Sequence, residues 1–377
     1  MRLKSVNSPK IFWKRYRYVV ITVAAAIIVA LALYFGGGGY REFLYLQMVF
    51  AAVSVIAGVV LSNFTEKKFA GPAERFLNIM TGYGNKDKDS EYGNDGVPIV
   101  SLRRLMKKYY SPVSVAVAGF KYRDAWQKNR DAKQFEYFIN CTDSLAKNLK
   151  IRQTGDTVFG IWEHDYPWSY GLNPPWVSAL AQGFGVQLLG YAYAVTFKEK
   201  YKNAAELALS AFFIDANEGG ITFKDGYNEW WYEEYVGKTL SSARVLNGMM
   251  YALVSLNEYF RATGSIRAQE LFDKGIASLK RRLMSFDAGW WTCYDDSGLV
   301  ATRQYHNVHL ELLDKLCRIT RDPVFFKKHE KWLKYRRPFF IREFIVQRPS
   351  WHDLAILLLN IGVVMAILEL AFIFKKI

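Results

Sequence analysis

Paired helical segments joined by short turns constrain the fold of this chain more than any other feature. Apolar residues recur with a helical period through three pairs of segments. The pairs cover residues 176–201 with 203–214, 241–263 with 265–284, and 306–321 with 323–335. A helical hairpin cannot bury its apolar face alone and must stack on neighbouring hairpins. The sequence therefore predicts a mainly α fold, an (α/α) toroid of repeated helical hairpins.

A repeated dipeptide supports this interpretation. Gln182-Gly183 in the first pair resembles Asn247-Gly248 in the second pair, 65 residues later. The loops at one end of such a toroid commonly form a groove, which would suit an extended sugar chain.

A small β portion is expected beside the helices. Residues 156–169 are rich in aromatic and β-branched side chains and should be extended. Residues 221–235 predict a hairpin or an extended excursion around Asp225-Gly226.

Three long apolar runs predict membrane helices in addition to the toroid. They cover residues 19–35, 43–61 and 354–374. Each run is close to the roughly 20 residues that cross a bilayer. The first run is longer than the apolar region of a typical signal peptide, and the tetraglycine after it offers no clear cleavage site. We therefore expect a multi-pass integral membrane protein with about three transmembrane helices.

The net charge of +15 is concentrated beside these apolar runs. Residues 1–18 carry six basic and no acidic side chains, and residues 321–348 carry nine basic and three acidic ones. Basic clusters at the ends of membrane helices are more typical of membrane topology and of contact with anionic lipid than of nucleic-acid binding. No nucleic-acid partner is therefore expected. The positive-inside rule favours the cytoplasmic face for the central domain. If residues 43–61 pack on the domain instead of spanning, the domain lies outside.

The expected domains follow from these segments. The order is a basic segment at 1–18, a transmembrane hairpin at 19–64, a linker or helical neck at 65–109, the toroid at 110–340 and a C-terminal transmembrane helix at 341–377. The Gly-rich stretch 82–97 has acidic residues that alternate like the start of a calcium loop. It lacks the loop's sixth-position Gly and twelfth-position acid, which favours a solvated linker.

The run Trp231–Tyr235 is the strongest chemical signal. Two carboxylates, Glu233 and Glu234, stand among three aromatic residues just before a helical segment. Desolvation among aromatic rings raises carboxylate pKa values toward the range useful for proton transfer. A helix-capping Glu beside ordinary core aromatics is the alternative interpretation.

Five motifs together resemble the C-terminal catalytic domain of the D-glucuronyl C5-epimerases, which convert glucuronate to iduronate within heparan-type chains. The motifs are WWYEEY, VLNGMMYAL, PWVSALAQG, CYD and YHNVH, and the resemblance covers roughly residues 110–340. It implies an isomerase with a helical catalytic domain preceded by β-rich modules. Most of that β portion is missing here.

The resemblance also implies the acid and base groups. Glu234 and Tyr305 would be the acid/base pair, and Tyr235 and Tyr294 match two further tyrosines of the family's site. Epimerisation at C5 removes the proton α to a carboxylate and returns one from the opposite face, without a redox cofactor. The chain has no dinucleotide-binding fingerprint, and we expect no cofactor.

The expected substrate-binding residues include a departure from the family. The family's Arg after the tyrosine-aspartate pair is absent, so Arg303, or else Arg244, should neutralise the uronate carboxylate. His306 and His309 share one helix face but lack the acid of a zinc motif, so no metal is expected. The remaining substrate-binding candidates are Trp176, Gln182, Trp231, Asn247 and His306.

The expected function is a membrane-anchored epimerase that inverts C5 of hexuronate residues. Its partners would be a uronate-containing polysaccharide or lipid-linked oligosaccharide and membrane lipids, and it could form a homodimer. The alternatives are a uronate lyase, a non-catalytic membrane glycan-binding protein, or a glycoside hydrolase. A hydrolase would pair Glu233 or Glu234 with Asp295 or Asp296. Proton exchange at C5 without cleavage distinguishes the epimerase from all of them.

Overall fold

The computed structural model describes residues 45–58, 89–102, 107–225, 229–238, 242–335 and 351–376. The chain divides into two compact units. One unit is Asn85–Tyr335, and the other combines Met1–Gly84 with Arg336–Ile377. We describe each unit by itself.

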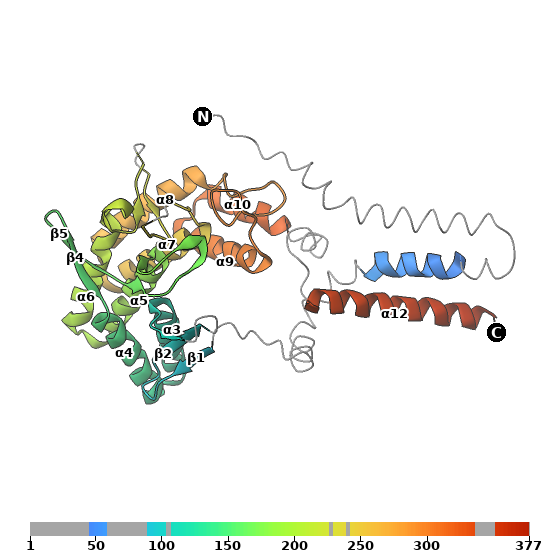
Figure 1. The fold of residues 1–377 in the computed structure, drawn as a ribbon, viewed down its shortest axis with the longest axis horizontal. Coiled ribbons are helices and arrows are strands. Elements are labelled where there is room, and N and C mark those ends of the chain that lie inside the picture. Colours follow the sequence, from blue (N-terminus) through green and yellow to red (C-terminus); the bar gives the residue numbers. More distant parts are fainter. Residues whose placement is uncertain are drawn as a thin grey trace. The chain divides into compact units, whose positions relative to one another are not determined.

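Helical hairpins form the larger unit (Figure 1). The hairpins are α3 (Pro112–Asn129) with α4 (Ala132–Lys147), α5 (Ala179–Thr196) with α6 (Glu199–Ser210), α7 (Leu246–Thr263) with α8 (Ile266–Arg282), and α9 (Arg303–Thr320) with α10 (Pro323–Lys334). The last three are the predicted pairs, with helix bounds that differ from those expected by up to five residues. The sequence analysis missed α3, although its start is marked by Ser111, whose hydroxyl accepts a hydrogen bond from the Ser114 amide, and by Pro112 in the first turn.

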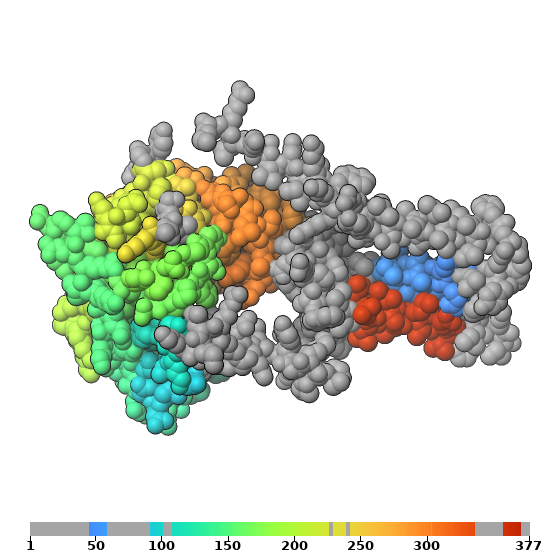
Figure 2. Space-filling model, viewed as in Figure 1, coloured from blue at the N-terminus to red at the C-terminus, as the bar shows by residue number. Residues whose placement is uncertain are grey.

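The first helix of each hairpin belongs to one inner row. In this row α3 packs on α5, α5 on α7, and α7 on α9, while each second helix covers its own partner. Gly183 allows α5 to approach α7 closely, because a Cβ there would lie 3.2 Å from the Ala252 Cα. The unit is therefore mainly helical, as the periodicity predicts, and on the face shown in Figure 2 it is one continuous body.

Short antiparallel strands connect the helices. The strands are β1 (Asp89–Tyr92), β2 (Pro98–Leu102) and β3 (Lys107–Tyr109) in one sheet, then the pairs β4 (Lys150–Thr154) with β5 (Thr157–Ile161), β6 (Glu163–His164) with β7 (Trp176–Val177), and β8 (Thr222–Phe223) with β9 (Trp231–Tyr232). Short 3₁₀ helices lie at Ser169–Gly171, Ala211–Phe213 and Ala216–Glu218. The β4–β5 hairpin projects at the edge of the unit (Figure 1). The expected extended stretches at 156–169 and 221–235 contain β5 to β6 and β8 to β9.

Backbone hydrogen bonds hold three loops together at the N-terminal ends of the inner helices. The Ala179 amide at the start of α5 donates to the Glu233 carbonyl at 2.8 Å. The Leu246 amide at the start of α7 donates to the Tyr294 carbonyl at 3.0 Å. The segment before α5, the segment before α7 and the loop before α9 therefore meet at one end of the row.

The smaller unit corrects the expectation of membrane helices. Within the described part of the chain, no helix is long and apolar enough to cross a membrane. The described helices of this unit cover residues 45–58 and α12 (Trp351–Lys376). The expected span at 19–35 lies outside the described residues.

The transmembrane part of the expected fold class and the expected multi-pass membrane localisation are therefore wrong. The helix at 45–58 instead packs on α12 within this unit. The Ser54 hydroxyl donates to the Met365 sulfur at 3.6 Å, and a Cβ on Gly58 would lie 2.6 Å from the Ile361 side chain.

Replacing Gln182 should destabilise the larger unit. This fully buried side chain donates to the Gly160 carbonyl at 2.7 Å and to the Ala208 carbonyl at 2.8 Å, and so joins β5, α5 and α6. Gln182→Leu removes the side-chain hydrogen bond from both buried carbonyls, and we expect a loss of about 2–4 kcal/mol in the free energy of unfolding, measured by urea denaturation. The exposed control Gln269→Leu should change it by less than about 0.5 kcal/mol. Equal effects of the two variants would contradict the assignment.

Candidate active site

A cavity of about 440 Å³ opens where the three loops meet. The segment before α5 and the loop before α9 supply most of its walls, and Tyr235 closes it from the segment before α7. Its lining residues are Trp168, Ser169, Tyr170, Tyr235, Tyr294, Leu299, Val300, Thr302 and Tyr305. Five of these side chains are aromatic, which suits a sugar ring better than a small ion.

Glu234 lies against the first turn of α7. Its side chain is 5% exposed, and its Oε2 accepts a hydrogen bond of 2.8 Å from the Asn247 Nδ2. Gly248 leaves room for it, because a Cβ there would lie 2.4 Å from the Glu234 Cβ. Burial raises the pKa of the Glu234 carboxyl to about 7, although the contacts with Tyr235, Asn247 and the Gly248 backbone oppose the shift. A carboxyl with this pKa can accept and return a proton near neutral pH.

Glu233 is equally buried but has different partners. Its carboxylate accepts hydrogen bonds from the Ser242 hydroxyl and, at 3.1 Å, from the Arg244 amide. Burial raises its pKa to about 7 as well. Neither carboxyl is a lining residue of the cavity, but Glu234 contacts the lining residue Tyr235, whereas the contacts of Glu233 hold the segment that leads into α7.

Three tyrosines lie together on the cavity wall. The Tyr235 and Tyr294 hydroxyls are 3.2 Å apart, and the rings of Tyr294 and Tyr305 meet edge to face with centroids 4.6 Å apart. Burial, followed by the nearby Glu234 carboxylate, raises the pKa of each phenol above its ordinary value. These phenols are therefore protonated at neutral pH and can donate a proton or a hydrogen bond.

Trp168 and Tyr170 also line the cavity, and Tyr170 was not among the expected site residues. The Tyr170 hydroxyl donates to the Asp295 Oδ2 at 2.5 Å, and the Trp168 Nε1 donates to the Tyr235 hydroxyl at 3.5 Å. Tyr170 has a left-handed backbone, with φ of 63°. The only sequence signal is the aromatic spacing of the segment YPWSY, because nothing in it indicates contact with residues 67 and 125 positions later.

The two expected arginines have different surroundings. Arg244 pairs with Glu229 at 3.4 Å and with Asp296 at 3.2 Å, and Arg282 contacts the same two carboxylates. Arg244 is therefore part of an ion cluster outside the cavity lining. Arg303 is the first residue of α9, next to the cavity residue Thr302, and its side chain lies outside the described part of the structure.

Several expected substrate-binding side chains pack in the core. Trp231 is fully buried and stacked on Phe286 with ring centroids 5.5 Å apart. Trp176 is stacked on His164 at 3.9 Å, and its indole nitrogen donates to the Tyr166 carbonyl. None of these side chains, nor Gln182, lines the cavity. Asn247 contacts the site through its hydrogen bond to Glu234.

His306 turns away from the cavity. Its Nδ1 is 2.9 Å from the Thr292 hydroxyl, and the Nδ1 of His309 is 3.0 Å from the same hydroxyl. His306 also stacks on Trp291 at 3.9 Å. Burial, followed by His306, lowers the pKa of His309 to about 3. Among the described residues no group of His, Cys, Asp and Glu could hold a metal ion.

Part of the chain is similar to one family of known proteins. A family profile described as D-glucuronyl C5-epimerase C-terminus matches residues 156–334, which include Glu234 and all three tyrosines. The D-glucuronyl C5-epimerase of Caenorhabditis elegans is 35% identical over 184 residues, which cover 44% of this chain and 29% of that protein. Residues 156–334 are therefore similar to the C-terminal part of the D-glucuronyl C5-epimerases.

The relatives are longer than the part of them that this chain matches. An uncharacterised protein of Methanocaldococcus jannaschii is 29% identical over 201 residues, which cover 52% of this chain and 64% of that protein. The chain thus matches just under two thirds of one relative's length and under a third of the other's.

Solved structures show only a distant likeness. Cellobiose 2-epimerase from Bacillus thermoamylovorans is 13% identical with a TM-score of 0.48, covering 72% of this chain and 73% of that chain. A D-mannose isomerase is 13% identical with a TM-score of 0.46, covering 70% and 69%. Likeness at this level supports no conclusion about fold or function.

Glu234→Gln should change how stability depends on pH. With a folded pKa of about 7 against an ordinary 4.5, wild-type stability falls as pH rises from about 4.5 to 7, because only the unfolded carboxyl ionises freely in that window. Glutamine does not titrate. Relative to wild type, the variant should therefore gain about 2–3 kcal/mol in free energy of unfolding between pH 5 and 8, measured by urea denaturation. A difference that stays constant over this range would contradict the raised pKa.

Proposed function

We propose that this protein is a cofactor-independent uronate C5-epimerase acting on hexuronate residues of an acidic glycan. The observation that supports it most strongly is the placement of Glu234. This buried carboxyl has a pKa near neutrality and lies beside Tyr235, Tyr294 and Tyr305 at an aromatic cavity, within the segment that matches the epimerase family.

The chemistry divides between one base and one acid. The Glu234 carboxylate removes the C5 proton, directly or through the Tyr235 hydroxyl, and the C5–H electron pair moves into the substrate carboxylate. The Tyr305 phenol then gives its proton to C5 from the opposite face, and solvent restores the phenol. Tyr294, which contacts both other tyrosines, positions them. The two faces of C5 thus meet different groups, which inversion requires.

The carboxylates of Asp295 and Asp296 are arranged poorly for glycoside hydrolysis. Asp296 is paired with Arg244 and Arg282. Asp295 accepts hydrogen bonds from the Ser297 amide and hydroxyl through Oδ1 and from Tyr170 through Oδ2. Both carboxylates are thus held by other side chains, whereas a glycosidase needs two carboxyl groups free to flank the scissile bond.

Hydrogen exchange at C5 tests the proposed base. Purified protein incubated with heparosan-type and other uronans in deuterated water should incorporate deuterium at C5, read by NMR, without chain cleavage. Glu234→Gln should lower the exchange rate at least about 10²-fold, because the base is lost. In the wild type kcat/KM should rise with pH through about 7, as Glu234 ionises.

Glu233→Gln is the matched control for this experiment. Its carboxyl is equally buried and has the same raised pKa, but it faces Ser242 and Arg244. It should retain exchange within a few-fold of wild type. Exchange at the wild-type rate in Glu234→Gln would refute the proposal, as would release of shorter chains by the wild-type protein.

Arg303 is the proposed cation for the substrate carboxylate. Removing a group that neutralises charge developing in the transition state typically costs about 10²-fold, so Arg303→Ala should lower kcat/KM by about that factor without lowering Tm. Arg244→Ala is the comparison, because it breaks the ion cluster and should cost about 1–3 kcal/mol of stability. Unchanged kinetics in Arg303→Ala would move the role to another residue.

A further inference from the structure

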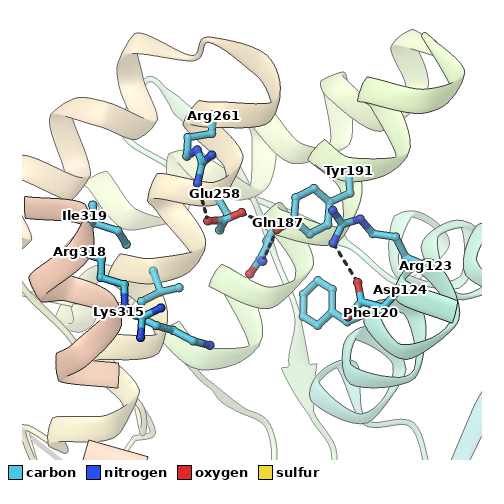
Figure 3. Close-up of a pocket in the computed structure, with 11 residues that line it drawn as sticks. Phe120, Arg123, Asp124, Gln187, Tyr191, Glu258, Arg261, Lys315, Arg318 and Ile319 are labelled. Atoms are coloured by element: carbon cyan, nitrogen blue, oxygen red, sulfur yellow. Dashed lines mark hydrogen bonds and ion pairs between the residues drawn. The ribbon is translucent and has the colours of Figure 1, made fainter. Parts of the chain in front are cut away.

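A second cavity, of about 380 Å³, lies among the inner helices away from the tyrosines. Residues of α3, α5, α7 and α9 all contribute to its wall (Figure 3). It shares no lining residue with the cavity of the candidate active site. It is therefore a separate feature of the same unit.

The second cavity is at the C-terminal ends of these helices. In α7 the cavity residue Glu258 follows Asn247 by eleven residues, and in α9 Lys315 follows Tyr305 by ten. At 1.5 Å per residue, these steps correspond to roughly 15–17 Å along each helix. The two cavities thus lie near opposite ends of the inner helices.

Four cations line the second cavity, Arg123, Arg261, Lys315 and Arg318, against the acidic Asp124 and Glu258. Arg261 and Arg318 lie in last helical turns, where a cation also stabilises the helix dipole. Stabilisation of the helix dipole does not explain Lys315, which has no ion-pair partner among the described residues.

Arg123 is held in place at the opposite wall, on α3. Its guanidinium lies 3.6 Å from the centroid of the Tyr191 ring and 3.2 Å from the Asp124 carboxylate. In Figure 3 the cations of α9 and the arginine of α3 come from helices on opposite sides of the cavity. An anionic group between them would contact positive charge from both sides.

Ordered uncharged groups form the floor between these cations. The Ser255 hydroxyl donates to the Gln187 Oε1 at 2.9 Å, and the Gln187 Nε2 donates to the Tyr191 hydroxyl at 2.9 Å. The Tyr191 hydroxyl donates in turn to the Glu258 Oε2 at 2.7 Å. The chain ends on the Glu258 carboxylate, which can accept further hydrogen bonds from a ligand hydroxyl.

We propose that this second cavity binds an acidic saccharide. Its carboxylate or sulfate groups pair with Lys315, Arg318 and Arg123, and its hydroxyls donate to Glu258. Phosphate fits less well, because it brings no hydroxyl-rich ring to the carboxylate of Glu258 and is repelled by it. The choice of saccharide rests on the proposed function. If the tyrosine cavity acts on an acidic glycan, a second site of this kind would bind such a glycan at a distance from that cavity.

Calorimetric titration with a heparin-derived hexasaccharide tests the second site in the full-length protein. We expect two bound molecules per chain in the wild type and one in Lys315→Gln/Arg318→Gln. Both replaced side chains are exposed, and within the described ranges Arg318 pairs only with Asp314 one turn away, so folding should be unaffected. The control Lys121→Gln/Lys128→Gln removes the same charge from exposed positions of α3 outside the cavity and should keep two sites.

The outcomes separate this proposal from the proposed epimerase. If the tyrosine cavity binds no saccharide, the wild type should bind one hexasaccharide per chain and the double variant none. That result would support the second site and would not support the proposed epimerase. An equal count in the double variant, the control and the wild type overturns the second site. Displacement of the hexasaccharide by inorganic phosphate at equal concentration, or tighter binding to phosphatidylglycerol vesicles through the same two residues, overturns the saccharide assignment.

Discussion

Two adjacent buried carboxyl groups, Glu233 and Glu234, determine how this unit is assembled. Neighbouring side chains of an extended segment point to opposite sides, so the two groups must find different partners. Glu233 holds Ser242 and the Arg244 amide, and Glu234 meets Asn247. The segment before α7 is therefore held on both of its sides, and the Glu234 carboxyl faces the start of the helix.

This arrangement costs stability at neutral pH. Both pKa values are raised to about 7 by burial, so each carboxyl opposes folding more strongly as pH rises from about 4.5 to 7. The backbone bonds from Ala179 to Glu233 and from Leu246 to Tyr294 help to offset that cost. A carboxyl held in this way keeps a pKa suited to proton transfer because the loops around it cannot relax.

The sequence predicted the parts of this structure that depend on local pattern. Helical periodicity identified three of the hairpins, and the aromatic run around Glu234 indicated a desolvated acid. The convergence of Tyr235, Tyr294 and Tyr305 was expected only through resemblance, because a contact such as that between Tyr235 and Tyr294, 59 positions apart, leaves no local signal. Tyr170 was missed for that reason.

Other expectations were wrong because the same residue types are typical of both core packing and sugar binding. Trp231 is aromatic beside a carboxylate, yet it fills the core against Phe286, and the buried amide of Gln182 satisfies backbone carbonyls. Composition cannot separate such packing residues from sugar-binding ones. The apolar runs were interpreted as membrane helices by length alone, which the described helices do not bear out.

The direction of the inner helices links the fold to the proposed chemistry. The N-terminal ends of α7 and α9 lie at the tyrosine cavity, where Glu234 meets Asn247 and where Thr302 and Tyr305 line the wall. Helix N-termini carry partial positive charge, which favours an anion held near them. The family's arginine after the tyrosine-aspartate pair is absent here, so these helix ends can supply part of the neutralisation that a developing enolate needs. The C-terminal ends of the same helices carry the opposite partial charge, and there the chain places arginine and lysine side chains instead.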